Sequence, residues 1–319
     1  MEAESQNLLD EVTSRFRFHR EAVGHGTLSI PNLRLKQGEF EFELDDIAIA
    51  IETGSLGLSL AGQLDHVDVS ELTRLITYAG QKKLFPERFS NALLSVSPGG
   101  ELKDLLFTNP PGEGIPHLVS SLVDFSVDAY LGVPSIDRLN GFVSLRPDRG
   151  YLDIDNDEFE INFKSMFDSP WTFDSGRGRL AYLVDEGSFS LTSGLIELLD
   201  GDLSASGKLL MNLPPARELH TWGLTMGVTD VELLKANVYI PKSIPENLRS
   251  WVKSSVKGGR SNEAGVTVHG SLFRGSPSVQ KAHDLYLKVE NTEVEYHPDW
   301  PSATDLTGTI HINNDHVFT

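Results

Sequence analysis

Cysteine is absent from the 319 residues of the chain. Without it there are no disulfide bonds, no zinc sites built from thiolates and no thiol nucleophiles. Long hydrophobic runs are missing too, since no window contains the 18 or more apolar residues that a transmembrane helix needs. The first residues, Met1-Glu2-Ala3-Glu4, have neither the basic region nor the apolar run of a signal peptide. We therefore predict no thiol chemistry and no membrane span within this sequence.

Basic residues are scarce as well. The chain has 27 Lys and Arg against 46 Asp and Glu, which gives a net charge of −19. A surface that binds nucleic-acid phosphates needs the opposite sign, and anionic lipid headgroups would be repelled for the same reason. We therefore expect no nucleic-acid partner, and we interpret the charge mainly as a means of keeping the protein in solution.

Apolar and polar residues alternate along much of the chain, which is typical of strands with one face in water. The runs with this period of two are Glu39–Leu44, Ile47–Ile51, Phe125–Ala129, Phe159–Phe163, Leu285–Glu290 and Ile310–Asn313. Clusters of turn-forming residues occur at Arg146–Gly150, Asp174–Gly176 and Asp185–Gly187. Short strands joined by short turns predict a mostly β protein with an antiparallel sheet rather than βαβ units.

Two stretches depart from this pattern and predict short helical insertions, at about residues 68–100 and 230–260. In each, a proline precedes a helical segment and a glycine pair follows it. The two stretches match at one constant spacing, which pairs Pro86 with Pro245, Phe89 with Leu248, Leu93 with Val252, Ser95 with Ser254, and Gly99-Gly100 with Gly258-Gly259. We interpret this as a repeat, with a first strand–helix module at 1–134 and a second at 135–319.

Two segments resemble ligand-binding loops but lack required residues. Gly201–Lys208 resembles a phosphate-binding loop, yet five residues separate its glycines and Leu209 follows the lysine. We predict a strand pair with a tight glycine turn there. Asp153–Asp157 resembles the start of a calcium loop, but Glu158 and Lys164 stand where glycine and a bidentate glutamate are needed. We predict that this segment is a charged turn between two strands.

Catalytic and metal-binding motifs are not found elsewhere in the chain. His311, Asp315 and His316 are candidate metal ligands, but the alternation at Ile310 and Ile312 puts His311 on the outer, solvated face of its strand. The sequence contains no HExxH, no GxSxG and no GxGxxG that opens a helix. Carboxylate pairs are frequent, but a glycosidase needs two that converge across a cleft. We predict that the chain is not an enzyme and has no metal and no cofactor.

The last third contains an ordered set of motifs. They are Tyr239-Ile240-Pro241, Ile244–Leu248, Trp251-Val252, Val256–Gly259, Tyr296–Pro301, Leu306–Ile310 and Asn313–Asp315. With the strand ladder of Phe125–Phe173 they resemble the YhdP family of AsmA-like, TamB-related proteins, over about residues 120–319. The match departs at Val252 and Ala303, where the family usually has leucine.

The resemblance implies a location and a task. Proteins of this kind are anchored in the inner membrane of Gram-negative bacteria by an N-terminal helix, and they cross the periplasm as an elongated, curled β-sheet with an open apolar groove. The YhdP group is implicated in moving phospholipid to the outer membrane, which maintains the integrity of the cell envelope. The final residues look like a cut rather than a natural end, so we expect this chain to be an internal segment of such a bridge, whose partners are phospholipid acyl chains.

Apolar residues of the alternating strands are the candidate lining of this groove. They are Phe125, Val127, Leu152, Ile154, Phe159, Ile161, Phe163, Leu285, Leu287, Val289, Ile310 and Ile312. On the pattern alone, the same residues would form the closed core of a β-sandwich or solenoid with a structural or interaction role and no lipid cargo. A carbohydrate-active enzyme is a third alternative, although no residue singles it out.

Overall fold

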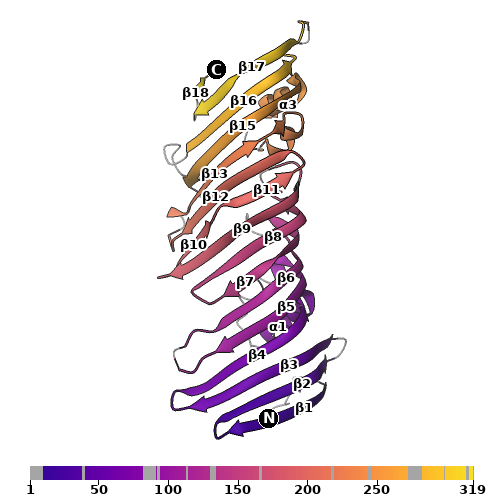
Figure 1. Ribbon diagram of the computed structural model, residues 1–319, viewed down its shortest axis with the longest axis vertical. Coiled ribbons are helices and arrows are strands. Elements are labelled where there is room, and N and C mark those ends of the chain that lie inside the picture. The colour runs from indigo at the N-terminus through magenta and orange to yellow at the C-terminus, as the bar shows by residue number, and fades with distance from the viewer. Residues whose placement is uncertain are drawn as a thin grey trace, which may run out of the picture. The chain divides into compact units, whose positions relative to one another are not determined.

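A computed structural model describes residues 10–37, 40–81, 91, 94–112, 114–129, 134–164, 167–216, 219–240, 242, 246–271, 282–297, 299–313 and 316–318. Two compact units are present: residues 1–130 with 137–150, and residues 131–136 with 151–319. Consecutive strands lie side by side within each unit (Figure 1). The predicted mostly β, antiparallel fold with short helical insertions is confirmed.

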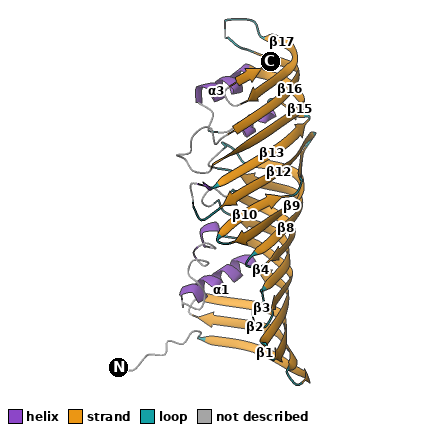
Figure 2. Ribbon diagram, turned by 90° about the vertical axis from the view of Figure 1, so that its left-hand side faces the viewer, coloured by secondary structure: helices purple, strands orange, loops and turns teal. Residues whose placement is uncertain are grey.

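The first unit is an antiparallel meander with one long helix. Its elements are β1 (Glu11–Ala22), β2 (His25–Gln37), β3 (Phe40–Gly54), β4 (Gly57–Asp68), α1 (Val69–Gln81), β5 (Gly99–Asn109), β6 (His117–Val127) and nearly all of β7 (Ser135–Leu145). Each strand from β1 to β6 pairs with the next in antiparallel register. The helix α1 follows β4 directly and lies on one face of this part of the sheet (Figure 2).

The second unit continues the same kind of pairing. Its elements are β8 (Arg149–Asn162, whose first two residues belong to the first unit), β9 (Trp171–Asp185), β10 (Ser188–Ser193), β11 (Ile196–Asp200), β12 (Leu203–Leu213), β13 (Thr221–Thr229), β14 (Val231–Glu232), the 3-10 helix η2 (Lys235–Tyr239), α3 (Glu246–Ser255), β15 (Val256–Ser271), β16 (Ala282–Val294), β17 (Ala303–Asn313) and β18 (His316–Phe318). The strands β10 and β11 together fill one position between β9 and β12, and β13 and β14 both pair with β15. The order then runs through β16, β17 and β18.

Seven strands contain a non-glycine residue with φ between 47° and 60°. They are Asp46, Asp104, Asp124, Arg138, Glu158, Asn291 and Asp305. Left-handed residues inside strands mark β-bulges, and the pairing shifts register beside Asp104 and Asn291. A bulge moves the alternation by one residue, so that Asn156 and Phe159, three positions apart on either side of Glu158, are both buried, at 2% and 3% exposed. The inner face of a strand therefore changes parity along its length.

Two predicted turns are wrong. Asp153–Asp157 lies in the middle of β8, and Asp174–Gly176 lies in β9. The acidic residues that suggested turns point to the outer face instead, where Asp153 and Asp155 bind Arg179 and Arg177. By contrast, Asp185–Gly187 joins β9 to β10, and the segment after Gly201 is the predicted hairpin, with Asp200 opposite Leu203.

The two helical insertions return to the sheet in the same way. Gly100 and Gly259 both have positive φ, and each packs against a bulge of the next strand. A Cβ on Gly100 would lie 2.6 Å from the Asp124 carbonyl oxygen, and one on Gly259 would lie 2.5 Å from Thr292 Oγ1. The NH of Asp128 donates to the Val96 carbonyl at 2.7 Å, and the NH of Glu295 donates to the Ser255 carbonyl at 2.8 Å. Pro86 and Pro245 lie outside the described residues.

Candidate functional site

A row of small and apolar residues crosses six strand positions of the second unit. Residues directly opposite each other in antiparallel pairs share one face of the sheet. Register places Leu198 opposite Ala205, and then continues through Val228, Ala264, Leu287 and Ile310. Each neighbour in this row is fixed by backbone pairing, so the row follows from register alone.

A second row runs beside the first on the same face. It consists of Ile196, Gly207, Met226, Val266, Leu285 and Ile312. We call the two rows together the apolar lane. Six strand positions at about 4.8 Å spacing give the lane a length of about 24 Å along the sheet. This exceeds the roughly 15 Å that one leaflet contributes to the hydrocarbon core of a bilayer.

Most of the lane is neither buried nor fully open. Leu285, Leu287, Ile310 and Ile312 are all half-buried, as are Met226, Val228 and Val266 on the preceding strands. A sandwich core would remove such residues from water nearly completely. Among the described residues, the lane is therefore an apolar surface that no second protein layer covers completely.

The opposite face of the same strands is polar. One row there holds Lys208, Thr225, Thr267, Asp284 and Asn313. His311 Nε2 lies 2.9 Å from Asp284 Oδ2, and Asn313 donates to the same oxygen at 2.7 Å. These contacts, with His311 first, hold the pKa of Asp284 below its ordinary value. His311 lies on this outer face, as the alternation predicts, and Asp315 is outside the described residues.

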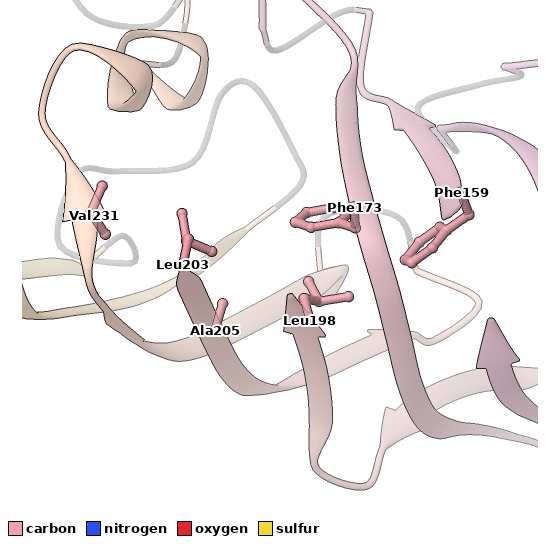
Figure 3. Packing of buried hydrophobic residues seen from close by; sticks show 6 residues of the cluster. All are labelled: Phe159, Phe173, Leu198, Leu203, Ala205 and Val231. Carbon is pink, nitrogen blue, oxygen red and sulfur yellow. The ribbon is translucent and has the colours of Figure 1, made fainter. Parts of the chain in front are cut away.

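One end of the lane is closed by a packed cluster. Phe159, Phe173, Leu198, Leu203, Ala205 and Val231 are all less than 10% exposed, and we call them the roofed cluster. Figure 3 shows their side chains gathered on neighbouring strands. The Phe173 and Phe159 rings pack in a tilted arrangement with centroids 5.4 Å apart, and Gly176 makes room for the Phe159 ring, which would lie 2.4 Å from a Cβ there.

The insertion that precedes β15 packs on this cluster through η2. Tyr239 and Ala236 contact it, as does Trp171 at the start of β9. The Trp171 ring lies 5.1 Å from the Tyr239 ring, and its Nε1 donates to the Val238 carbonyl at 3.3 Å. Burial raises the pKa of the Tyr239 hydroxyl. Phe163 and Phe167 extend the aromatic packing around Trp171.

The first unit carries a comparable apolar face. Its row consists of Phe18, Leu28, Ile49, Gly62, Phe107 and Leu118. Gly62 again makes room for a ring, because its Cβ would lie only 2.0 Å from Phe107. A buried cluster of Ile47, Leu64, Val67 and Leu105 lies beside this row, and Leu72 of α1 packs on it.

Ten of the twelve predicted lining residues lie in the second unit, and Phe125 and Val127 lie on β6 in the first. Leu285 is opposite Ile312, Leu287 is opposite Ile310, and Val289 continues the same face opposite Gly308. Phe159 and Ile161 belong to the roofed cluster or pack on it, and Phe163 stacks on Trp171. Leu152 and Ile154 are half-buried, on the face of β8 opposite to Asp153 and Asp155. Their role in lining a groove stays a prediction.

Several lane residues were missed from the sequence. Met226, Val228 and Val266 alternate with glycine or threonine rather than with charged residues, so their runs gave a weaker signal. Leu198 and Leu203 flank the Gly201 hairpin, where the sequence predicts only a strand pair with a tight turn. Trp171 could not be found at all, because its partner Val238 is 67 residues away.

Neither a metal-binding cluster nor a membrane-spanning helix is present in the part of the chain that the structure describes. Within the described ranges, no three His, Asp or Glu side chains come together in a group that would hold a metal ion. In the same ranges, no helix is both long and apolar enough to cross a bilayer.

Comparisons with known proteins give one match. No curated protein and no solved structure matches the chain. The family model described as YhdP protein matches residues 1–318, which extends the relationship well beyond the motifs of the last third. This family comprises envelope proteins of the lipid-transport, bridge-like kind and is not known as a family of enzymes. With the match covering nearly the whole sequence, the chain belongs to the YhdP family.

Proposed function

We propose that this chain is a segment of a periplasmic bridge that shields phospholipid acyl chains while they pass between the inner and outer membranes of a Gram-negative bacterium. In this proposal the apolar lane receives the acyl chains and the headgroups remain in water. An anchor helix outside this segment attaches the protein to the inner membrane. The observation that carries the proposal is the unbroken, half-exposed lane in a member of this family.

The size of the hydrophobic effect explains why such a lane is useful. An acyl chain of about 16 methylenes costs on the order of 13 kcal/mol to expose to water, at about 0.8 kcal/mol per CH₂. A carrier must therefore cover the chain continuously, and register makes the lane continuous across six strand positions. No bond is made or broken in this task, so it requires no catalytic residue.

The charge distribution supports the same proposal. Long exposed apolar surfaces cause association between copies of a protein. The outer face carries ion pairs such as Arg177 with Asp155 at 2.8 Å, within a chain of net charge −19. Self-repulsion of this size keeps copies apart and leaves the lane available for lipid.

Site-specific photo-crosslinking tests the proposal. An amino acid with an aliphatic diazirine replaces Leu287 in the lane, and the matched control replaces Lys288, the exposed neighbour on the opposite face. The protein is illuminated with vesicles of palmitoyl-oleoyl phosphatidylcholine, and adducts are identified by mass spectrometry. We expect phospholipid adducts at position 287 at least about tenfold above those at 288, because only the lane has a surface that favours acyl chains. Equal capture at both positions, or none at 287, would show that the lane does not hold lipid.

A further inference from the structure

One carboxylate in the second unit gathers three cations from a distant part of the chain. Asp168 lies in the connection between β8 and β9. Its Oδ2 accepts hydrogen bonds from Lys253 Nζ at 3.0 Å and Arg249 Nη1 at 3.1 Å, both on α3. Lys242 Nζ lies 3.9 Å from Oδ1 and donates to the Lys164 carbonyl at 3.0 Å. This arrangement, which we call the Asp168 node, ties the segment before β15 to the segment before β9.

The node spans a distance that the sheet alone does not close. Four steps separate β9 from β15 in the pairing order, through β11, β12 and β13. At about 4.8 Å per step the two strands are about 19 Å apart along the sheet. The two strands run in the same direction, so their first residues lie at the same end of the strands in the sheet. Asp168 precedes β9 by three residues and Lys253 precedes β15 by three, yet their side chains touch.

The contact between Asp168 and α3 therefore spans the strand ends at which the roofed cluster lies. Leu198 and Leu203 flank the hairpin between β11 and β12, and Val231 follows β13, so all three lie at these strand ends. Figure 3 shows Phe173, Leu198 and Leu203 side by side on adjacent strands. Ala236 and Tyr239 of η2 cover the roofed cluster at these strand ends, and α3 follows η2 in the chain, while Leu287 and Ile310 farther along the lane stay half-buried.

The helices η2 and α3, which follow each other in the chain, are attached to the rest of the unit by different forces. The helix η2 packs on the cluster through Ala236 and Tyr239. No described side chain of α3 from Glu246 to Ser254 is buried. The described polar contacts of α3 with the rest of the unit are the Asp168 node and the backbone bond from Glu295 to Ser255 at the helix end. Arg249, whose side chain is 13% exposed, also binds Glu246 on the same helix. An ionic attachment is weakened by water and salt, whereas apolar burial is not.

We propose that α3 is a releasable latch for η2, whose Ala236 and Tyr239 cover the roofed cluster, and that Asp168 holds it shut until it opens to extend the lane toward β9. When the node is intact, the lane ends at the roofed cluster. When it opens, α3 turns about its C-terminal end, η2 leaves the sheet with it, and Leu198 is exposed to an acyl chain. The gating of acyl chains rests on the proposed function, whereas the latch itself does not.

The latch is tested first without lipid. Asp168→Asn removes the charge that the three cations share, and Asp155→Asn is the matched control because it removes an ion pair of the outer face on β8. Hydrogen exchange of the α3 amides is followed by mass spectrometry in low salt. We expect exchange in α3 to become about fivefold faster in Asp168→Asn and to stay unchanged in Asp155→Asn, which matches the modest strength of exposed ion pairs. Unchanged exchange in Asp168→Asn would overturn the latch.

The absence of cysteine allows the closed state to be locked. A variant with Asp168→Cys and Lys253→Cys carries the only two thiols in the chain, and a short bis-maleimide joins them. Diazirine residues at Leu198, under the roof, and at Leu287, in the open lane, then report on vesicles of palmitoyl-oleoyl phosphatidylcholine. We expect Asp168→Asn to raise capture at 198 about fivefold and the locked variant to reduce it, with capture at 287 the same in all.

The outcomes separate the two proposals. Capture at 287 in no variant would refute the lipid-binding function, and the exchange experiment would still decide the latch. Capture at 287 with an unchanging signal at 198 would show that α3 does not gate the lane. Capture at 198 that rises in Asp168→Asn and falls in the locked variant supports the latch and its gating role.

Discussion

The helices α1 and α3 each belong to the insertion that interrupts their unit, but they are held by different forces. The first residue of α1, Val69, is 6% exposed, and Leu72 packs on the buried cluster of β3, β4 and β5. In α3 no described side chain before Ser255 is buried, and Arg249 and Lys253 join the helix to Asp168 by ion pairs. The entry also differs, since Asp68 Oδ1 accepts from the Glu71 NH at 2.9 Å and caps α1.

Only the exits of the two insertions are alike. In both, a positive-φ glycine lies against a bulge of the next strand, and the residue that follows that strand donates a backbone hydrogen bond to the insertion, at Val96 or Ser255. The comparison teaches that the return to the sheet is fixed by backbone geometry, whereas the attachment of the helix body is free to vary. A helix attached by apolar burial stays on the sheet at any salt concentration. A helix attached by ion pairs can be released by salt or acid.

The largest effect is expected at the shared exits. Gly100→Ala and Gly259→Ala each force a side chain into a left-handed conformation and against atoms at 2.7 Å or less. We expect each to lower the free energy of unfolding of its own unit by about 3 kcal/mol, because backbone strain and overpacking add. Gly258→Ala is the control, since nothing lies within 4 Å of its Cβ and its φ is not positive.

The two units can be followed separately in that experiment. All four tryptophans, at 171, 222, 251 and 300, belong to the second unit. Urea unfolding followed by tryptophan fluorescence therefore measures Gly259→Ala, and hydrogen exchange of the β5 and β6 amides measures Gly100→Ala. A loss in one unit and none in the other would show that the exits are not equivalent.

The next largest effect distinguishes the two helix bodies. Leu72→Ala removes apolar contact between α1 and the sheet, and we expect a loss of about 2 kcal/mol, the low end for leucine because the side chain is only half-buried. Val252→Ala in α3 should cost less than about 1 kcal/mol, since that helix is not held by burial. Hydrogen exchange of each helix gives both values. Equal losses of stability in the two variants would show that α1 and α3 are attached to the sheet in the same way.

Much of the fold was predictable because a strand with one face in water alternates apolar and polar residues along the sequence. The strands around Phe42, Ile161 and Leu287 were found in this way. The bulges were not, because an aspartate such as Asp46 or Asp124 looks the same whether it faces water, makes a turn or adopts positive φ. The misplaced turns at Asp153 and Asp174 have this cause. A signal does exist: an acidic residue with buried residues two before and one after it, as around Glu158.

The site was less predictable than the fold. Alternation identifies the apolar face of each strand, but register decides which residues meet, and no local feature specifies that Leu287 stands opposite Ile310. The Asp168 node joins residues 85 positions apart. In sequence, Asp168 is one of 46 acidic residues, and only the path of the chain distinguishes it from the others.

A smaller effect is expected where η2 packs against Trp171, at the start of β9. Trp171→Phe keeps the aromatic packing on Tyr239 and removes the hydrogen bond from Nε1 to the Val238 carbonyl. We expect a loss of about 1 kcal/mol in the second unit, the usual net value of one hydrogen bond. Trp251→Phe, on the exposed side of α3, should change stability by less than about 0.5 kcal/mol. Urea unfolding followed by circular dichroism compares the two. A larger loss in Trp251→Phe would mean that α3 is held by burial after all.

The smallest effect is a response to acid that only α3 should show. Hydrogen bonding to Lys253 and the charge of Arg249 hold the pKa of Asp168 below its ordinary value. A carboxylate with a lowered pKa in the folded state stabilises that state above its unfolded pKa, about 3.9 for aspartate, and the contribution is lost as the pH falls through the lowered value. Protection of the α3 amides, corrected for the intrinsic exchange rate, should therefore be constant from neutral pH to about pH 4 and decline below it. In Asp168→Asn most of this decline should disappear, and a smaller step should remain from Glu246, whose pKa the neighbouring Arg249 also lowers. Val69, Leu72 and Thr73 attach α1 by burial and carry no ionisable group, so the helix beyond its capped first turn should lose protection in acid only together with the whole first unit. If α3 lost protection at the same pH as that unit, acid would be unfolding the protein as a whole, and the difference between the two helices would not lie in charge.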